Sequence, residues 1–522
     1  MALRLPTVIC VLACAAARAL AQSAARGAGL SASRADAAAS GGVCRVSSGA
    51  DSGAGSLRAA LADPGCTSVV IAAGTTVVLE SQLDVTTSVV ISCDVAAAPF
   101  DIWSSISGGG GGGSPLKCVL DGAGRTRILY VETTSPGLRL TLRGLVLRNG
   151  VALVNSDLAD TAGAIYFRPP GGVLTVEACV FESNRALFLG GAIRTKNTAD
   201  VCLAGITLIV RDSTFDQNQA PFGGAISTGT CTTFTLERSI FTRNVAAPTE
   251  VTDGFSGGGA VSSGGTQLRV QGSSFDANVA GLTSGALELF STCPFDFTDD
   301  PFQQTTTAEI SASVFKANRA GADATADLTG SGGAVTAYGC NFREPVQGVA
   351  LPRTMLRLSD SSFDANAALG ADAYGGAVAT AYGVSTLVLS TAFAADRDAC
   401  SPNGALYINT FSSEGSGCTD TLSVQAEVTP ACDAWTPLGL VHEEAGSLAT
   451  DTRQPCVPLE PSKTGAFCCS PSLAAPALVC PLAPDVPTDL TCAGTTPRQA
   501  SATAKADVMI RMLAMKMGDT MA

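Results

Sequence analysis

A six-fold repeat is the feature of this sequence that most restricts its fold. Six segments, such as LIVRDSTFDQNQA and LRVQGSSFDANVA, share an apolar residue seven positions before a Phe and an aliphatic residue five before it. Each also has Ser or Cys two positions before the Phe, Asn three after it and Ala five after it. The repeated pairs are Phe181 and Asn184, Phe215 and Asn218, Phe241 and Asn244, Phe275 and Asn278, Phe315 and Asn318, and Phe363 and Asn366.

A second motif, Gly-Ala-aliphatic, follows each Phe segment. A further Gly precedes it in five copies, and Ser284 takes that place in the sixth. Gly at a corner allows positive φ without a Cβ penalty, and the following Ala leaves room for close approach. We therefore expect the glycines of this motif to be structural: Gly191, Gly224, Gly259, Gly285, Gly333 and Gly376.

The period and the local alternation together predict the fold. The shortest distance between repeated Phe residues is 26 positions, and the longer ones differ by polar or Gly-rich stretches. A period of this size, built from short segments in which apolar residues alternate, is typical of a β-solenoid with one coil per repeat. Equivalent strands would stack about 4.8 Å apart, so identical side chains form ladders along the axis. We predict an all-β, right-handed parallel β-helix.

Each repeated residue type has a predicted role in such a coil. The aliphatic and Phe side chains would fill the interior, while Ser or Cys would occupy a narrow position beside the large ring. The repeated Asn would stack in a turn, its amide bonding the next Asn or the local backbone. The segment LTLRGLVLRNG resembles a degraded first copy, and a last copy places Asp396 where Asn is expected.

The N-terminal sequence predicts export followed by a cap. Arg4 precedes an apolar run that ends near Ala17, and Ala19-Leu20-Ala21 matches a signal-peptidase site. Further on, Ser56 opens a run of helix formers that stops at Pro64-Gly65, which predicts one short helix covering the first coil. Strand-like runs follow it. A cap of this kind would protect a terminal coil from edge-to-edge aggregation.

The domain organisation follows from these shifts in pattern. We expect a signal peptide (1–21), a low-complexity leader (22–42), a cap with the first coils (43–137), β-helix repeats (138–410), a Cys- and Pro-rich module (411–495), and a flexible or weakly helical tail (496–522).

Charge and cysteine usage exclude several classes of function. The formal net charge is −13, and no basic face that could neutralise phosphates is visible, which argues against nucleic-acid binding. No later segment is apolar for the roughly 20 residues of a spanning helix. Removing the signal leaves 17 of 19 Cys, an odd number, so at least one thiol is free or paired with another chain. With one His, His442, and no C-x-x-C pair, a zinc site is not expected.

The repeats resemble those of the polymorphic outer membrane proteins of chlamydiae, whose passenger domains carry repeated G-G-A-I and F-x-x-N tetrapeptides. The resemblance covers roughly Leu138 to Leu406. It implies an exported β-helix of the kind built as autotransporter adhesins. The residues after Leu406 show no series of alternating ten-residue strands, so we expect no autotransporter barrel.

No catalytic, cofactor-binding or metal-binding residue is predicted. Asp216, Asp276 and Asp364 each follow a repeated Phe, but the same position in other copies holds other residue types, which favours a solvated face. The insertion from Phe295 to Phe302 holds three Asp residues that suit Ca²⁺, yet their spacing matches no EF-hand loop and a polar insertion is favoured. The Gly run at 108–113 lacks a phosphate-loop ending.

Two hypotheses about function remain open. The first is a secreted or cell-surface β-helix, non-enzymatic and adhesin-like, whose insertions contact a cell-surface or matrix protein or carbohydrate. The predicted contact segments are Pro248 to Gly257, Thr292 to Thr307 and Tyr338 to Pro352. The alternative is a carbohydrate-active β-helix enzyme, a polysaccharide lyase or glycoside hydrolase. Converging carboxylates and Arg in a groove would favour the enzyme.

Overall fold

The computed structural model describes most of the chain between residues 42 and 396 and the backbone of five short strands beyond it. The described ranges are 42–94, 117–152, 161–197, 204–249, Thr252, 254–291, 305–322, 330–339 and 354–396, the last with gaps at 371–372, 374, 382–383, 390 and 395. The predicted signal peptide, leader and tail, the insertion at 295–302, the Gly run at 108–113 and most of the Cys- and Pro-rich module lie outside the described residues.

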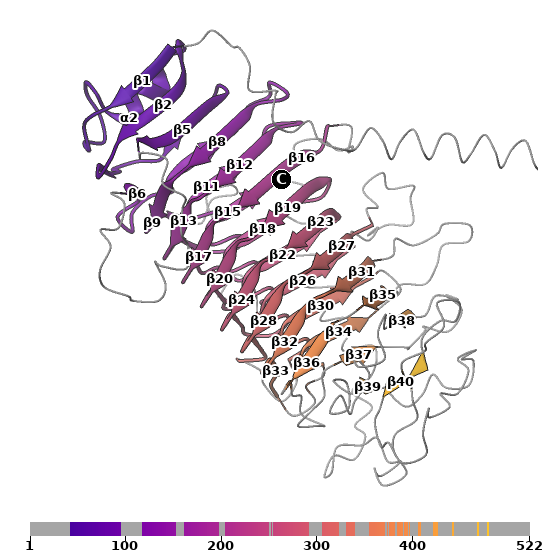
Figure 1. Ribbon diagram of the computed structural model, residues 1–522. Helices are drawn as coiled ribbons and strands as arrows, with labels where there is room; N and C mark the ends of the chain where they lie inside the picture. Colours follow the sequence, from indigo (N-terminus) through magenta and orange to yellow (C-terminus); the bar gives the residue numbers. More distant parts are fainter. Residues whose placement is uncertain are drawn as a thin grey trace, which may run out of the picture. The chain divides into compact units, whose positions relative to one another are not determined.

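Sheet A supplies the first side of each coil (Figure 1). Its strands alternate inward, buried residues with outward, more exposed ones, as in the sequence pattern. In spatial order the strands are β1 (Gly42–Val46), β2 (Cys66–Ala72), β5 (Val89–Asp94), β8 (Arg139–Arg143), β12 (Val173–Glu177), β16 (Ile206–Arg211), β19 (Thr232–Glu237), β23 (Thr266–Gln271), β27 (Thr307–Ser311), β31 (Thr354–Ser359), β35 (Val384–Leu389) and β38 (Thr421–Gln425).

Sheet B follows sheet A in every coil and carries the repeated Phe. Its strands are β3 (Thr76–Val78), β6 (Cys118–Asp121), β9 (Leu145–Arg148), β13 (Val180–Glu182), β17 (Thr214–Asp216), β20 (Ile240–Thr242), β24 (Ser274–Asp276), β28 (Val314–Lys316), β32 (Ser362–Asp364) and β36 (Ala392–Ala394).

Sheet D consists of two-residue strands that come directly after the repeated Asn. They are β10 (Val151–Ala152) and β14 (Arg185–Ala186), then β21 (Val245–Ala246), β25 (Val279–Ala280), β29 (Arg319–Ala320) and β33 (Ala367–Ala368). Gln219 bridges the two pieces, because it pairs in parallel with both Arg185 and Val245.

Sheet C closes each coil after the Gly-Ala motif. Its strands are β4 (Leu83–Asp84), β7 (Leu129–Val131), β11 (Ile165–Phe167), β15 (Ile193–Thr195), β18 (Ile226–Thr228), β22 (Val261–Gly264), β26 (Leu287–Phe290), β30 (Val335–Tyr338), β34 (Val378–Ala381), β37 (Leu406–Ile408) and β39 (Val441–His442). Outside these sheets, β40 (Phe467–Cys468) and β41 (Leu478–Val479) form an antiparallel pair.

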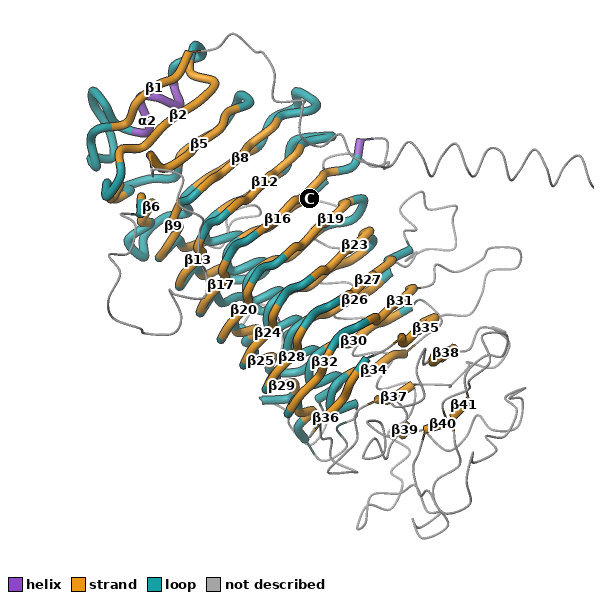
Figure 2. Tube along the Cα trace, in the orientation of Figure 1, coloured by secondary structure: helices purple, strands orange, loops and turns teal. Residues whose placement is uncertain are grey.

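The order of the strands along the chain defines a parallel β-helix. The chain passes from β16 to β17, then to β18, and returns to sheet A as β19. β16 pairs with β19, β17 with β20, and β18 with β22, all in parallel and all with equivalent residues opposite one another. Figure 2 shows the same succession of strand and turn in coil after coil. The predicted all-β fold is confirmed.

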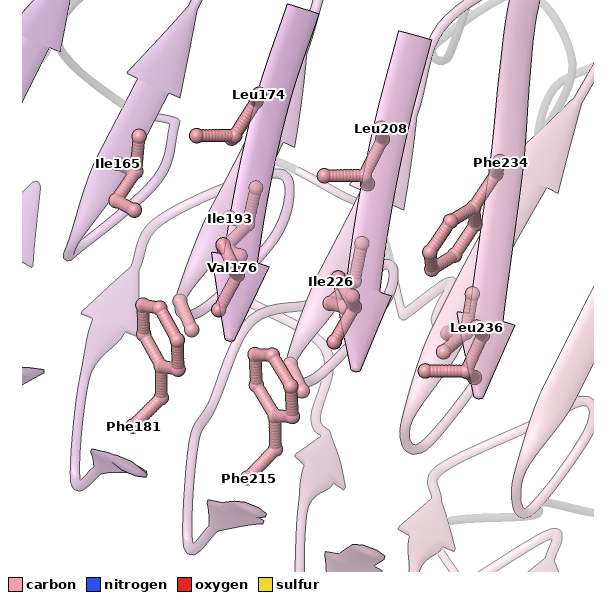
Figure 3. Packing of buried hydrophobic residues seen from close by; sticks show 14 of the residues in the cluster. Ile165, Leu174, Val176, Phe181, Ile193, Leu208, Phe215, Ile226, Phe234 and Leu236 are labelled. Atoms are coloured by element: carbon pink, nitrogen blue, oxygen red, sulfur yellow. The ribbon is translucent and has the colours of Figure 1, made fainter. Parts of the chain in front are cut away.

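The core is built from rows of identical or similar side chains. Leu174, Leu208 and Phe234 lie one above the other on adjacent strands of sheet A, beside Phe181 and Phe215 from sheet B (Figure 3). All five are fully buried. Burying a side chain of this size stabilises the fold by roughly 1.5 to 3 kcal/mol, so each added coil extends the core by several such increments.

The N-terminal cap matches the predicted helix. Helix α2 (Leu57–Ala62) begins after Ser56, whose hydroxyl accepts a hydrogen bond from the backbone N–H of Ala59 at 3.2 Å, and Asp63 caps its C-terminus. Leu57 is fully buried in the core. Disulfides Cys44–Cys66 and Cys93–Cys118 join the strands of these first coils. No helix among the described residues is long and apolar enough to cross a membrane.

Candidate functional site

The six repeated Asn residues form a continuous hydrogen-bonded ladder. In each step the side-chain amide and the backbone N–H of one Asn both donate to the side-chain oxygen of the Asn in the next coil, as Asn218 does to Asn244 at 3.0 Å. The same amide donates to a backbone carbonyl one coil earlier, that of Leu147 for Asn184 and that of a repeated Phe for the others, as Asn218 does to Phe181 at 3.1 Å. All six Asn are fully buried. Gly150 stands at the start of the ladder and Asp396 at its end.

The six repeated Phe residues form a parallel stack inside the coils. The ring of Phe215 lies 4.7 Å from that of Phe181 and 4.6 Å from that of Phe241, with planes inclined by 2° in both pairs. The stack continues to Phe393, which pairs with Phe363. Each Phe is at most 1% exposed from Phe181 to Phe363. These side chains therefore serve the fold and offer nothing to a ligand.

The structural reason for the repeated glycines differs from the expected one. Positive φ occurs at the residue before the expected one, as at Gly258 with φ +68, and Ser284 takes the same conformation with φ 60. A Cβ added to the expected residue, Gly259, would instead overlap the carbonyl oxygen of Gly285 in the next coil. The expected set is therefore required by close backbone contact between coils. The assignment of positive φ to that set was wrong.

A second hydrogen-bonded ladder was not recognised in the sequence. The backbone N–H of Ser239 donates to the hydroxyl of Ser273 in the next coil at 3.2 Å, and the hydroxyl of Ser239 donates to the carbonyl of Glu237 at 2.8 Å. Equivalent bonds run from Cys179 to Ser361. Small size was read as the requirement at this position, two residues before Phe. The hydroxyl's ability to donate and accept is an additional requirement.

The Asp residues that follow the repeated Phe lie on the outward face of sheet B. Asp216 pairs across coils with Glu182 and Thr242, in register. Its carboxylate accepts two hydrogen bonds from the guanidinium of Arg243, at 3.0 and 2.6 Å, and Asp276 and Lys316 are exposed. The contact between Asp216 and Arg243 is an ion pair between adjacent coils.

The outward face of sheet C differs from those of sheets A and B. Most outward residues of sheets A and B are half-buried or exposed, Val146 and Asp121 being buried exceptions, whereas those of sheet C from β11 to β34 are buried although many are polar. From β11 to β34 the buried outward row is Tyr166, Arg194, Ser227, Ser262, Glu288, Thr336 and Ala379. Apart from the adjacent Ser227 and Ser262, the residue type changes at every step of this row, so the sequence pattern could not reveal it.

The polar groups of this row contact one another and the corner before sheet C. Arg194 donates to the hydroxyl of Ser227 at 3.0 Å. The carboxylate of Glu288 accepts hydrogen bonds from Ser262 at 2.7 Å and from Thr283 at 3.0 Å. A Cβ on Gly257 would overlap that carboxylate. Glu288 is thus bound within the protein and is not placed as a free general acid or base.

An aromatic and charged cluster occupies the first coils of the same face. The rings of Tyr130 and Tyr166 stack at 5.4 Å, and the guanidinium of Arg127 lies 5.3 and 5.4 Å from their centres. Glu132 accepts a hydrogen bond from the Tyr130 hydroxyl and forms an ion pair of 2.8 Å with Arg168. Burial, and after it the hydrogen bond to Glu132, raises the pKa of Tyr130 well above its usual value, so the phenol stays protonated.

The connections between coils lengthen at the two ends of sheet C. Residues 153–160, 250–253, 323–329 and 371–374 precede strands of sheet C, and residues 198–203, 292–304 and 340–353 follow them. The corner between sheets A and B is short from β8 onward, as where Asp212 and Ser213 alone link β16 to β17. The exception is residues 95–116, between β5 and β6. Two of the three predicted contact segments fall mainly at positions outside the described residues.

These observations define the chain as a parallel β-helix protein. A scan against models of known families finds no match, and a search of curated proteins finds none either. Among solved structures the chain is similar to the catalytic unit of a thermostable GH87 alpha-1,3-glucanase from Streptomyces thermodiastaticus strain HF3-3. The identity is 13%, the match covers 74% of this chain and 70% of that one, and the TM-score is 0.38. A similarity at this level carries no argument about activity.

Proposed function

We propose that this protein is an exported, non-enzymatic β-helix scaffold that binds a cell-surface or matrix partner through the connections at the two ends of sheet C. The observation that carries the proposal is the distribution of those connections. From β8 onward the long ones leave the coils at the corners that flank sheet C, while the corner between sheets A and B keeps a short connection. Binding residues are often carried by loops on a rigid scaffold.

Two further observations support this function. The disulfides Cys44–Cys66 and Cys93–Cys118 suit an oxidising, extracellular compartment. The resemblance of the repeats to those of chlamydial polymorphic outer membrane proteins favours an adhesin-like role. On sheet B the carboxylate of Asp216 is engaged by Arg243, and on sheet C that of Glu288 is engaged by Ser262 and Thr283. Both arrangements stabilise a scaffold better than they would serve acid or base catalysis.

One coil has no long connection between sheet C and sheet A, and it shows how such a connection could be deleted from another coil. Gly265 alone separates β22 from β23, which begins at Thr266. In the coil two further on, Gly339 follows β30 and Thr354 begins β31, and these residues occupy the register positions of Gly265 and Thr266. Joining Gly339 directly to Thr354 would recreate the same Gly-Thr link. The hydroxyl of Thr354 already donates to the carbonyl of Tyr338.

The same construction works one coil earlier. Ser291 follows β26, and Thr306 precedes β27 at the position of Thr266. The backbone N–H of Thr306 donates to the hydroxyl of Ser291 at 3.1 Å, so the two residues already lie side by side. Deleting residues 292–305 should therefore close the coil without changing the strands on either side.

The experiment compares the secreted full chain with the two deletions, 292–305 and 340–353, singly and together. Binding to mammalian cells, to extracellular-matrix proteins and to a glycan array is measured, along with degradation of a panel of polysaccharides. We expect the double deletion to fold with an unchanged melting temperature and to lose at least tenfold in binding. Binding that survives both deletions would overturn the proposal, and so would polysaccharide degradation by the full chain.

A further inference from the structure

The Asn ladder ends on a residue with different chemistry. The backbone N–H and the side-chain amide of Asn366 donate to Oδ1 of Asp396 at 2.9 and 2.8 Å, as each Asn does to its successor. Asp396 is 2% exposed. Oδ1 of Asp396 thus accepts the same two hydrogen bonds from the preceding coil that the side-chain oxygen of each ladder Asn accepts.

The second oxygen of Asp396 cannot reproduce the amide when the carboxyl group is ionised. In every coil from Asn184 to Asn366 the amide nitrogen also donates to a backbone carbonyl of the preceding coil, as Asn366 does to Phe315 at 3.0 Å. The equivalent carbonyl for Asp396 is that of Phe363. Oδ2 of Asp396 is buried and has no hydrogen-bond partner among the described residues. In the ionised form, Oδ2 of Asp396 and the carbonyl of Phe363 are both acceptors, whereas at the equivalent positions of the other coils an amide donor meets a carbonyl acceptor.

We propose that Asp396 is protonated in the folded protein, that its Oδ2–H donates to the carbonyl of Phe363, and that loss of this proton loosens the coil that contains β35 and β36. The proton makes the carboxyl group an isostere of the Asn amide, with one accepting and one donating atom. The last described coil of the ladder, β35 and β36, would thus be closed at acidic pH and opened more readily above neutral pH.

The surroundings of Asp396 favour the neutral form. Burial raises its pKa to about 7, and the nearby charge of Asp364 acts in the same direction, while the hydrogen bonds from Asn366 oppose them. Of the described strands packed around it, β32 carries Asp364, whereas β33 and β36 carry no charged residue. No cation on these strands offsets the cost of burying a carboxylate.

The direction of the pH dependence follows from the raised pKa. An ordinary Asp has a pKa of 3.8, and the folded value is about 7. Between these values the opened coil releases a proton that the closed coil keeps, so the stability of the closed state falls as pH rises. This contribution is fully present below about pH 4 and is lost by about pH 7, above which both states are ionised.

Hydrogen exchange of the full secreted chain tests the proposal. After correction for intrinsic exchange, the opening constant of peptides from β35 and β36 should rise by up to about tenfold per pH unit between pH 5 and 7 and then level off. Peptides from β23 and β24, beside the Asn278 rung, should show no such rise. Asp396→Asn should remove the pH dependence and raise protection at pH 8, whereas Asp364→Asn on the outward face should keep most of the dependence.

Two results would overturn the proposal. One is equal pH dependence in the original protein and in Asp396→Asn. The other comes from infrared difference spectra of the same two proteins at pH 5.5, which should contain the C=O band of a protonated carboxylic acid. A carboxylate band in its place would show that the group is ionised in the folded state.

Discussion

The side-chain amide of Asn244 donates to the side-chain oxygen of Asn278, one coil further along, at 2.9 Å. The backbone N–H of Asn244 donates to the same oxygen at 3.0 Å, and Asn278 in turn donates to Asn318 and to the carbonyl of Phe241, both at 3.0 Å. The side chain of Asn278 thus takes part in four buried hydrogen bonds. The side-chain amide and backbone bonds between coils, such as that from the N–H of Val279 to the carbonyl of Asn244 at 2.9 Å, together hold the turn between sheets B and D.

Replacing Asn278 by Ala should destabilise the protein strongly. The sequence alone suggests a loss on the order of 1 kcal/mol, for one hydrogen-bonding residue. The structure raises this to roughly 2 to 4 kcal/mol, because the backbone N–H of Asn244 would be left buried and unpaired and the carbonyl of Phe241 would lose a donor. Urea denaturation measures the change. Thr242→Ala, on the outward face of β20, is the control and should change stability by less than about 0.5 kcal/mol.

The two glycines of one corner should respond differently to substitution by Ser. A Cβ on Gly258, which has φ +68, would overlap the carbonyl oxygen of Val261 in the same coil. Ser284 nevertheless holds a side chain in nearly the same conformation one coil later, with φ 60, so the corner can adjust and Gly258→Ser should cost only about 1 to 2 kcal/mol. In Gly259→Ser the new Cβ would overlap the carbonyl oxygen of Gly285, which belongs to the backbone and cannot rotate away.

We expect Gly259→Ser to abolish secretion of folded protein or to cost more than about 4 kcal/mol. Secretion yield and melting temperature are the measurements. Equal tolerance of Ser at both positions would contradict the close contact between coils.

The roles of the repeated residues could be predicted from the sequence because identical side chains stack favourably from coil to coil. The roles of residues that do not repeat could not be predicted in this way. Phe215 and Asn218 recur because each contacts its own equivalent in the next coil. The outward row of sheet C, with Arg194 beside Ser227, contacts unlike residues and leaves no periodic trace. A Gly-Gly pair reveals two restricted positions, but not which one needs positive φ and which one needs the absence of a Cβ.

Strain in the Asn corner can be relieved by a single substitution. The residue before each ladder Asn has positive φ although none is Gly, and Ala277 has φ 54. An L-residue in this conformation costs roughly 1 to 2 kcal/mol. Gly avoids that steric cost but loses more chain entropy on folding, so the net gain is smaller than the steric cost.

We therefore expect Ala277→Gly to stabilise the protein by about 0.5 to 1 kcal/mol. Ala392→Gly, in β36 and without positive φ, is the matched control and should be neutral or destabilising. Thermal denaturation of both variants decides the matter. A lower melting temperature for Ala277→Gly would show that the corner is not strained.

The free thiol of Cys179 should be unreactive until the protein unfolds. Cys179 is buried, and burial is the main cause that raises its pKa to about 12 from 9.0. Because the thiolate is the reactive form, iodoacetamide at pH 8.5 should label this residue only after denaturation, as mass spectrometry can show. The folded protein keeps the Cys179 thiol protonated. The stability that this thiol contributes is therefore present below about pH 9 and is lost as pH rises toward 12.

Cys179→Ser should remove that alkaline loss and fit the hydroxyl ladder. The thiol of Cys179 donates to the carbonyl of Glu177 at 3.2 Å, whereas the hydroxyl of Ser213, at the same position one coil later, donates to the carbonyl of Arg211 at 2.7 Å. A Ser at 179 would therefore gain a shorter bond, and we expect a stability within about 1 kcal/mol of the original. Cys179→Val, of similar size but without a donor, should lose about 1 kcal/mol because the carbonyl of Glu177, which also accepts from the backbone N–H of Gly144 at 3.1 Å, loses one of its two donors. If Val were tolerated as well as Ser, size alone would govern this position and the hydroxyl ladder would contribute nothing.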